Sequence, residues 1–365
     1  MTQGVLEGTR LPWANATVRL HVVGRLLLGL AAVVLLALVA WTTLRPGAHA
    51  TDFATFYHGG KRVLHGLSPY PLLSSLPAVS DPKSFAPFVY PPPLAFAIVP
   101  LSFLPFGVAN AAFFLLGVAA AVLALRLLGV RDWACYAAAF ASAPLLAAPA
   151  NGSVSAFLLL GVAAAWRYRD RAGRAAALVA SVVVAKVFLW PLWLWLVCTR
   201  RYRAAALSAV AGVAVTAGAW AAIGFAGLRE YPHLLSRLTE LTGVNSYSLY
   251  ALERAAGLAP GAAELGVLAV AATAAGLAIR HRSDERLFMA AIGLALLLTP
   301  IMWQHYLVLL FVPIAIARPA MSKLWLVPLL FWFDPSSWSS GEALRIAPVF
   351  ALAAALLVTT MRTAR

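Results

Sequence analysis

The ionisable side chains with the most informative positions are Asp52, Lys186 and His305. Asp52 precedes a stretch in which apolar residues recur at helical spacing, Lys186 interrupts a long apolar run, and His305 opens a late one. A carboxylate can act as a general base by taking a proton from an attacking hydroxyl. A lysine and a histidine in apolar surroundings attract an anion strongly, because the local dielectric is low. These residue types suit a catalytic or an anion-binding role.

Each of the three residues also has a structural explanation. An aspartate before an apolar-periodic segment commonly caps the N-terminus of a helix. A lysine near the tip of a hairpin can extend along apolar surface to reach the membrane interface. A lone histidine is more often a hydrogen-bonding residue of the core than a catalytic one. The residues alone leave both explanations open.

The composition of the chain predicts that these residues are positioned by helices in a membrane. Of the 365 residues, 62% are hydrophobic and 11% are charged, whereas soluble domains carry about 25% charged residues. The net charge of +15 comes from small basic clusters between apolar runs rather than from one patch, so no nucleic-acid partner is expected. Cys135 and Cys198 lie in apolar stretches, which indicates neither a disulfide framework nor a thiolate metal site.

Apolar runs long enough to cross a bilayer recur along the whole chain, which we interpret as one polytopic membrane domain, 1–365. The first run could be a signal peptide, but its length favours a retained anchor helix. The sequence predicts an all-α protein with about twelve transmembrane helices, at 24–44, 106–127, 133–149, 153–167, 174–186, 187–200, 204–225, 261–279, 287–300, 304–318, 323–333 and 344–361.

The distribution of charge predicts the orientation of these helices. Most Lys and Arg residues fall on one set of connecting segments, which we assign to the cytoplasm together with both termini. Asp52 and His305 then face outward. The largest outer segment, 45–105, is predicted to carry interfacial helices and the candidate active site, with Asp52 as the N-cap of a short helix. A second outer loop, 226–260, contains Asn245.

The outer segment also carries a recognisable pattern. Asp52-Phe53-Ala54-Thr55-Phe56-Tyr57, Gly59-Gly60-Lys61-Arg62 and Gly66-Leu67-Ser68-Pro69-Tyr70 resemble the first outer loop of the polyprenol-phosphate-mannose-dependent mannosyltransferases, glycosyltransferase family 87 of the glycosyltransferase-C superfamily. The later segments Phe88-Val89-Tyr90-Pro91-Pro92-Pro93-Leu94 and Gln304-His305-Tyr306 are similar to further blocks of that family. Asn151-Gly152-Ser153 stands where many relatives have a Gly-Gln turn, so the resemblance assigns that turn no role.

The resemblance implies a glycosyltransferase that moves a sugar, mannose in this family, from a polyprenyl-phosphate donor to a glycolipid acceptor such as a phosphatidylinositol mannoside. It implies an inverting reaction at the outer face of the bilayer, with Asp52 as the general base. His305 and Lys186 would contact the donor. The other expected substrate-binding residues are Tyr57, Lys61, Arg62, Tyr90, Asn245 and Gln304.

No metal or other cofactor is expected, because the chain contains no Asp-x-Asp pair, no His-Glu-x-x-His motif and no cysteine cluster. The main alternative function is a multi-pass lipid or solute transporter or flippase, which also uses interrupted membrane helices. It would require ionisable residues near the bilayer midplane and an internal repeat. Lys186 is nearly alone within the predicted crossings, and the block around Asp52 has no second copy. A membrane scaffold would not explain why polar residues gather on one face.

Overall fold

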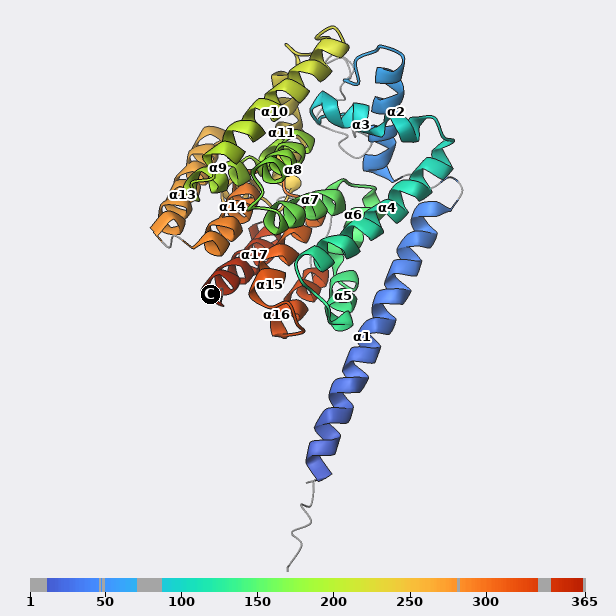
Figure 1. Ribbon diagram of the computed structural model, residues 1–365, viewed down its shortest axis with the longest axis vertical. Helices are drawn as coiled ribbons and strands as arrows, with labels where there is room; N and C mark the ends of the chain where they lie inside the picture. Colours follow the sequence, from blue (N-terminus) through green and yellow to red (C-terminus); the bar gives the residue numbers. More distant parts are fainter. Residues whose placement is uncertain are drawn as a thin grey trace, which may run out of the picture.

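The computed structural model describes residues 12–45, 47, 50–70, 87–280, 283–333 and 343–363. Over these residues the protein consists of α-helices, short 3-10 helices and turns, with no β-strand. The helices pack into one bundle, and the N-terminal part of α1 (Pro12–Leu44) projects well beyond it (Figure 1). Helices suit a chain of this composition because each satisfies its own backbone hydrogen bonds in lipid.

Every predicted crossing coincides with one helix or with two successive helices. Besides α1 these are α4 (Phe106–Leu127), α5 (Trp133–Phe140) with α6 (Ala143–Asn151), α7 (Ser155–Arg167), α8 (Ala172–Ala185), η3 (Val187–Leu189) with α9 (Pro191–Cys198), α10 (Tyr202–Ala222), α13 (Pro260–Arg280), α14 (Asp284–Leu298), η5 (Gln304–Leu310) with α15 (Phe311–Ala317), α16 (Lys323–Leu326) with η6 (Val327–Phe333), and α17 (Ala343–Thr363).

Five helices of the described part are long and apolar enough to cross a membrane, or six if the bent pair of α5 and α6 counts as one span. The two axes of that pair meet at 62°. The shorter apolar helices include α7, α8 and the pair formed by η3 and α9. The protein is therefore an all-helical membrane protein, and the number of twelve crossings stays a prediction.

The short helix that was predicted with Asp52 at its N-cap is present as α2 (Thr51–Leu64). It packs closely on α3 (Pro92–Ser102), and a Cβ added at Gly60 would lie 2.4 Å from the Ser102 hydroxyl. The predicted cap was wrong, since Ala50 is the N-cap and no side chain caps this end. Asp52 lies inside the first turn instead, so capping does not explain its position.

The second predicted outer loop, 226–260, folds into α11 (Tyr231–Thr242), η4 (Gly243–Asn245) and α12 (Leu249–Ala255). It is joined to the segment before η5 by side-chain hydrogen bonds, because the Ser248 hydroxyl donates to the Pro300 carbonyl at 2.8 Å. The backbone N–H of Tyr247 donates to the Met302 carbonyl at the same distance. These bonds fix the chain just ahead of His305.

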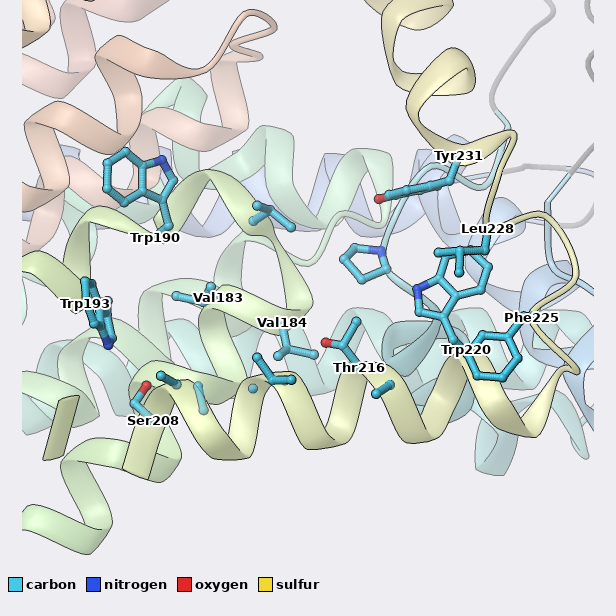
Figure 2. Close-up of a pocket in the computed structure, with 17 residues that line it drawn as sticks. Val183, Val184, Trp190, Trp193, Ser208, Thr216, Trp220, Phe225, Leu228 and Tyr231 are labelled. Atoms are coloured by element: carbon cyan, nitrogen blue, oxygen red, sulfur yellow. The ribbon is translucent and has the colours of Figure 1, made fainter. Parts of the chain in front are cut away.

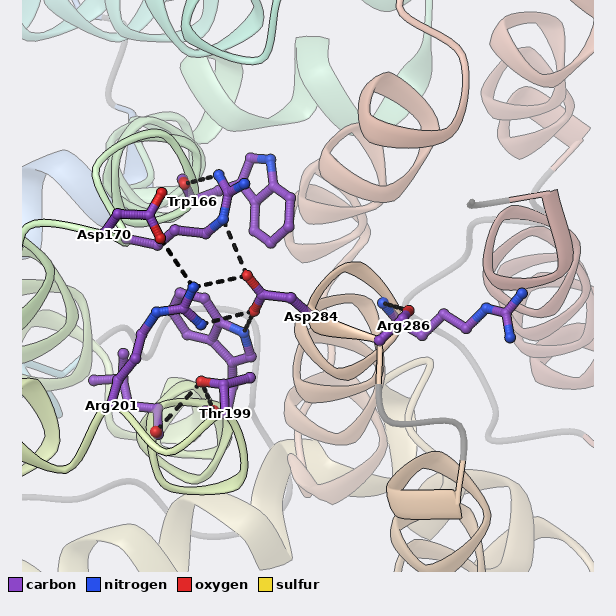
Figure 3. Close-up of polar contacts among 10 residues, drawn as sticks. Trp166, Asp170, Thr199, Arg201, Asp284 and Arg286 are labelled. Carbon is purple, nitrogen blue, oxygen red and sulfur yellow. Dashed lines mark hydrogen bonds and ion pairs between the residues drawn. The ribbon is translucent and has the colours of Figure 1, made fainter.

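A cluster of charged residues ties together three helix ends that the sequence assigns to the cytoplasm. The Asp284 carboxylate at the start of α14 accepts hydrogen bonds from Arg169, after α7, and from Arg201, after α9 (Figure 3). The Trp195 indole N–H donates to the same carboxylate at 2.8 Å. We call Arg169, Trp195, Arg201 and Asp284 the Asp284 cluster.

Candidate active site

The structure brings together the three residues that the sequence selected for chemistry. Asp52 comes from α2, Lys186 from the break between α8 and η3, and His305 from η5. The Nε2 atom of His305 lies 3.9 Å from Oδ2 of Asp52. Lys186 is close enough to both for its charge to act on each of them. We call Asp52, Lys186 and His305 the Asp52 site.

Asp52 has the environment of a weakly acidic carboxyl group. Burial raises its pKa to about 6, against the opposing effect of the positive charge on Lys186. The side chain still keeps 27% of its surface accessible, so a substrate can reach the carboxylate. A carboxyl group with this pKa is largely ionised at neutral pH and is a better proton acceptor than an ordinary aspartate.

Lys186 is held inside the protein rather than at the lipid interface. The residue ends α8 in an extended conformation, and its ammonium group donates a hydrogen bond of 3.2 Å to the Tyr90 hydroxyl. The same group lies 4.6 Å from the centre of the Tyr90 ring and 4.1 Å from that of Tyr306. Phe188 stacks on Tyr306 with ring centres 5.2 Å apart. Two aromatic faces therefore fix the cation beside Asp52.

His305 is buried, with 5% of its surface exposed, yet Nε2 has no hydrogen-bond partner among the described residues. The distance to Asp52 is too long for a hydrogen bond. Leaving a buried polar atom unpaired is costly, on the order of 1–3 kcal/mol. A bound ligand that pairs with Nε2 of His305 would explain why this buried nitrogen has no partner.

The turn that ends α6 supports the first turn of α2. Gly152 has a φ of +64°, a backbone conformation that residues other than glycine rarely adopt. A Cβ placed there would lie 2.5 Å from Cβ of Phe53 and 2.9 Å from Cβ of Ala50. The absence of a side chain at Gly152 is thus what allows α2 to lie close enough to carry Asp52 into the site. Sequence reasoning gave this glycine no role, although Asn-Gly after an apolar run is a common helix end.

The other predicted substrate-binding residues are distributed unevenly around the site. Tyr90 is part of it, as described above. Tyr57 is buried and its hydroxyl donates to the Leu104 carbonyl at 2.7 Å. Lys61 lies over the Tyr57 ring at 4.9 Å, and Arg62 donates to the Ser68 carbonyl at 2.5 Å. Tyr57, Lys61 and Arg62 therefore make these contacts beyond the first turn of α2, which carries Asp52.

Two further predicted residues lie on neighbouring elements. Gln304 precedes His305, and its amide N–H donates to the Phe331 carbonyl at 3.0 Å. Asn245 ends η4 in the second outer loop. Sequence reasoning did not select Phe188 and Tyr306, which help to hold Lys186. Their aromatic character in apolar runs gave no local signal that the two rings would stack.

An apolar groove of about 650 Å³ lies between α8, α9 and α10 (Figure 2). Pro91 and Val187 are among its lining residues, and they follow Tyr90 and Lys186 directly in the chain. One part of the groove therefore lies next to the residues that hold the ammonium group. An ionisable site beside an apolar groove in a helical membrane protein suits a substrate with a charged head and an apolar chain.

The fold and the site thus define an all-helical membrane protein in which ionisable side chains are gathered at one site. The sequence model of glycosyltransferase family 87 matches residues 88–313, which is more than half of the chain and includes Tyr90, Lys186 and His305. The chain belongs to glycosyltransferase family 87. It is therefore a glycosyltransferase, as its resemblance to this family implied.

A curated relative matches nearly the whole chain. The chain is 29% identical over 370 aligned residues to a polyprenol-phosphate-mannose-dependent alpha-(1-2)-phosphatidylinositol pentamannoside mannosyltransferase of Mycolicibacterium smegmatis (strain ATCC 700084 / mc(2)155). The alignment covers 94% of this chain and 83% of the relative. No solved structure matches the chain.

Proposed function

We propose that this protein transfers mannose from a polyprenyl-phosphate donor to a glycolipid acceptor, with Asp52 as the general base. The observation that carries the proposal is the Asp52 site itself, where a carboxyl group with a pKa of about 6 lies beside a fixed ammonium group and an unpaired histidine nitrogen. The relative from M. smegmatis supports the sugar and the donor, since its name specifies polyprenol-phosphate-mannose. The fold would be of the glycosyltransferase-C type.

The chemistry requires only one carboxylate. The acceptor hydroxyl oxygen forms a bond to the anomeric carbon of mannose while the bond from that carbon to the phosphate oxygen breaks. The electron pair leaves with the polyprenyl phosphate, which is a stable anion and needs no general acid. The hydroxyl proton passes to Asp52. A single displacement of this kind inverts the anomeric carbon and turns a β-linked donor into an α-linked product.

Lys186 and His305 would act on the phosphate of the donor. As the sugar departs, the phosphodiester becomes a phosphomonoester and gains negative charge. The Lys186 ammonium group, fixed between Tyr90 and Tyr306, would stabilise that charge without having to reorganise. The unpaired Nε2 of His305 would donate a hydrogen bond to a phosphate oxygen or to a sugar hydroxyl.

The site would open at the outer face of the membrane, with both termini in the cytoplasm. The clustering of basic residues on the opposite loops supports this orientation. Labelling of single cysteines at positions 52 and 169 with an impermeant reagent in intact cells tests it. We expect labelling at 52 and protection at 169 until the cells are opened. The reverse pattern would contradict the outer location.

The acceptor would be a phosphatidylinositol mannoside, because the relative's name specifies such a lipid. The direct test incubates the purified protein in detergent with polyprenyl-phosphate [14C]mannose and a phosphatidylinositol mannoside fraction. We expect label in a larger glycolipid from which an α-mannosidase releases it. Movement of intact donor across the bilayer of proteoliposomes without a new glycolipid would overturn the proposal in favour of a lipid transporter.

A further inference from the structure

We propose that the groove between α8, α9 and α10 holds the isoprenoid chain of the donor. The inference rests on the proposed function and assigns a lipid-binding site to a surface next to the Asp52 site. The groove is almost entirely apolar, with Ser208 and Thr216 as the only aliphatic hydroxyl residues among those that line it. Figure 2 shows Trp190 and Trp193 at one end.

At the other end of the groove lie Trp220, Phe225, Leu228 and Tyr231, as the same view shows (Figure 2). The α10 residues of its lining run from Ser208 to Trp220, a helical rise of roughly 18 Å. The shape is therefore elongated along one helix. An extended chain fits such a shape better than a compact headgroup does.

The end near Tyr231 adjoins the segment that carries Tyr90. The Tyr231 hydroxyl donates to the Val89 carbonyl at 3.0 Å, which fixes α11 beside the segment that carries Tyr90. Pro91 lines the groove, and Tyr90 accepts the hydrogen bond from Lys186. A phosphate held by Lys186 would therefore lie at the start of the groove.

This position distinguishes between the lipids that the reaction involves. In the donor, the first carbon of the isoprenoid chain is bonded directly to a phosphate oxygen. The acyl chains of a phosphatidylinositol mannoside are separated from its reacting hydroxyl by glycerol, phosphate, inositol and sugars. A groove that begins beside the residue for the donor phosphate is therefore placed for the donor chain and not for the acyl chains of the acceptor.

The lining also suits a branched chain. Lipid tails are as apolar as the groove, so a lipid gains little hydrophobic free energy by leaving the bilayer, and binding depends on close packing instead. The lining combines small residues with β-branched and aromatic ones, and the small residues include Ala180, Ala209, Gly212 and Ala217. The space over these small residues can receive the methyl branches that an isoprenoid carries at regular intervals.

Gly212 offers a direct test. It lines the groove, and a Cβ there would lie 3.6 Å from Val184, an ordinary contact. It is about 12 Å along α10 from Trp220, so a side chain at 212 would meet a long donor chain and leave a short one untouched. Gly218 on the same helix has nothing within 4 Å and does not line the groove. It is the matched control.

The experiment compares Gly212→Leu, Gly212→Ala and Gly218→Leu with two mannosyl donors, undecaprenyl-phosphate mannose and citronellyl-phosphate mannose. We expect Gly212→Leu to raise KM for the long donor by about tenfold or more, the equivalent of overpacking a tight site. The KM for the short donor and for the acceptor should stay within about twofold, because neither ligand reaches position 212. Gly212→Ala and Gly218→Leu should resemble wild type with both donors.

The outcomes separate this inference from the proposed function. Mannosyl transfer by the wild-type protein from the short donor supports the function whatever the groove binds. A rise in KM for the acceptor alone in Gly212→Leu would assign the groove to the acyl chains and overturn the inference. Equal effects of Gly212→Leu and Gly218→Leu, or a Gly212→Leu protein whose activity falls with both donors alike, would also overturn it.

Discussion

Two groups of ionisable residues in this protein are built in opposite ways. In the Asp284 cluster, the carboxylate accepts hydrogen bonds from Arg201 at 2.8 and 2.9 Å and from Arg169 at 3.1 Å. In the Asp52 site, the carboxylate lies 3.9 Å from Nε2 of His305, which is beyond hydrogen-bond distance. The first group has its charges paired at hydrogen-bond distance, whereas the second brings charges close without pairing them.

The pKa shifts of the two aspartates differ in direction for this reason. Burial alone would raise the pKa of Asp284, but hydrogen bonds from Arg201 and Trp195 and the charges of Arg201 and Arg169 outweigh burial and lower it. Burial dominates at Asp52 and raises its pKa to about 6. Ionised Asp284 thus contributes stability that is present above its unfolded pKa and is lost as pH falls through the lowered value.

The contribution of Asp52 to stability changes with pH in the opposite direction, since its pKa in the folded state lies above the unfolded value of 3.8. The folded state binds the proton more tightly, so the stability that Asp52 contributes decreases as pH rises from about 4 to about 6. At neutral pH the ionised carboxylate therefore costs stability. A carboxylate that destabilises the fold but lies beside a fixed cation is better explained by a role in binding or chemistry than by a structural one.

The largest effect is expected for Asp52→Asn. Asparagine keeps the shape of the side chain but cannot take up a proton, so kcat should fall by about 10²–10⁴-fold, the usual contribution of a general base. Because ionised Asp52 costs stability, the thermal unfolding midpoint should not decrease. Steady-state transfer assays and unfolding in detergent measure both. A well-folded variant with kcat within a few-fold of wild type would refute the catalytic role.

Lys186→Met should give the next largest effect. Methionine fills much of the same space without the charge, so kcat/KM for the donor should fall about 10–100-fold, as expected for a lost charge-assisted hydrogen bond. Lys323→Met is the control, because Lys323 is exposed at the start of α16 and has no place in the Asp52 site, and it should stay within about twofold. Equal losses in both variants would mean that Lys186 has no special relation to the donor.

The sequence supplied the helices and the three central residues but not their surroundings. Apolar runs and the helical spacing after Asp52 are local signals, and α2 follows them closely. The sequence predicted one crossing at 133–149, whereas the structure has α5 and α6 at 62° to each other. The cap assigned to Asp52 was wrong because Ala50 is the N-cap and α2 begins at Thr51. The contact of Gly152 with Phe53 joins segments far apart in the chain, so no local pattern indicates it.

The close approach of Gly152 to α2 predicts a moderate effect on turnover. In Gly152→Ala the added Cβ would push against Phe53 and Ala50, and a small displacement of Asp52 should lower kcat by on the order of tenfold. Gly129→Ala is the matched control, since Gly129 also has positive φ but nothing within 4 Å. Both variants place an alanine at a backbone position with positive φ. Equal kcat values in the two would show that Gly152 does not position Asp52.

The pH dependence of the wild-type rate should follow the ionisation of the Asp52 carboxyl group. Since Asp52 must be ionised to accept the proton, kcat/KM should decrease as pH falls through about 6. The change should be about tenfold per pH unit below that value. Lys323→Met should leave the pH profile unchanged, because Lys323 is exposed in α16. A rate that stays constant between pH 7 and pH 5 would contradict the assignment of Asp52 as the base.

The smallest effect on turnover is expected for Asp284→Asn, which should instead lower stability. The variant leaves Arg169 with an uncharged partner, whereas Arg201 keeps its ion pair with the exposed Asp170. The side chains of Arg169, Arg201 and Asp284 are at most about one-third exposed. The free energy of unfolding should fall by about 1–3 kcal/mol, while kcat stays within about twofold of wild type. Glu240→Gln, which removes the more exposed pair with Arg237, should change neither quantity measurably. If Asp284→Asn left the unfolding midpoint unchanged but reduced kcat as strongly as Asp52→Asn does, the two groups would not divide into one that holds the fold and one that performs the reaction.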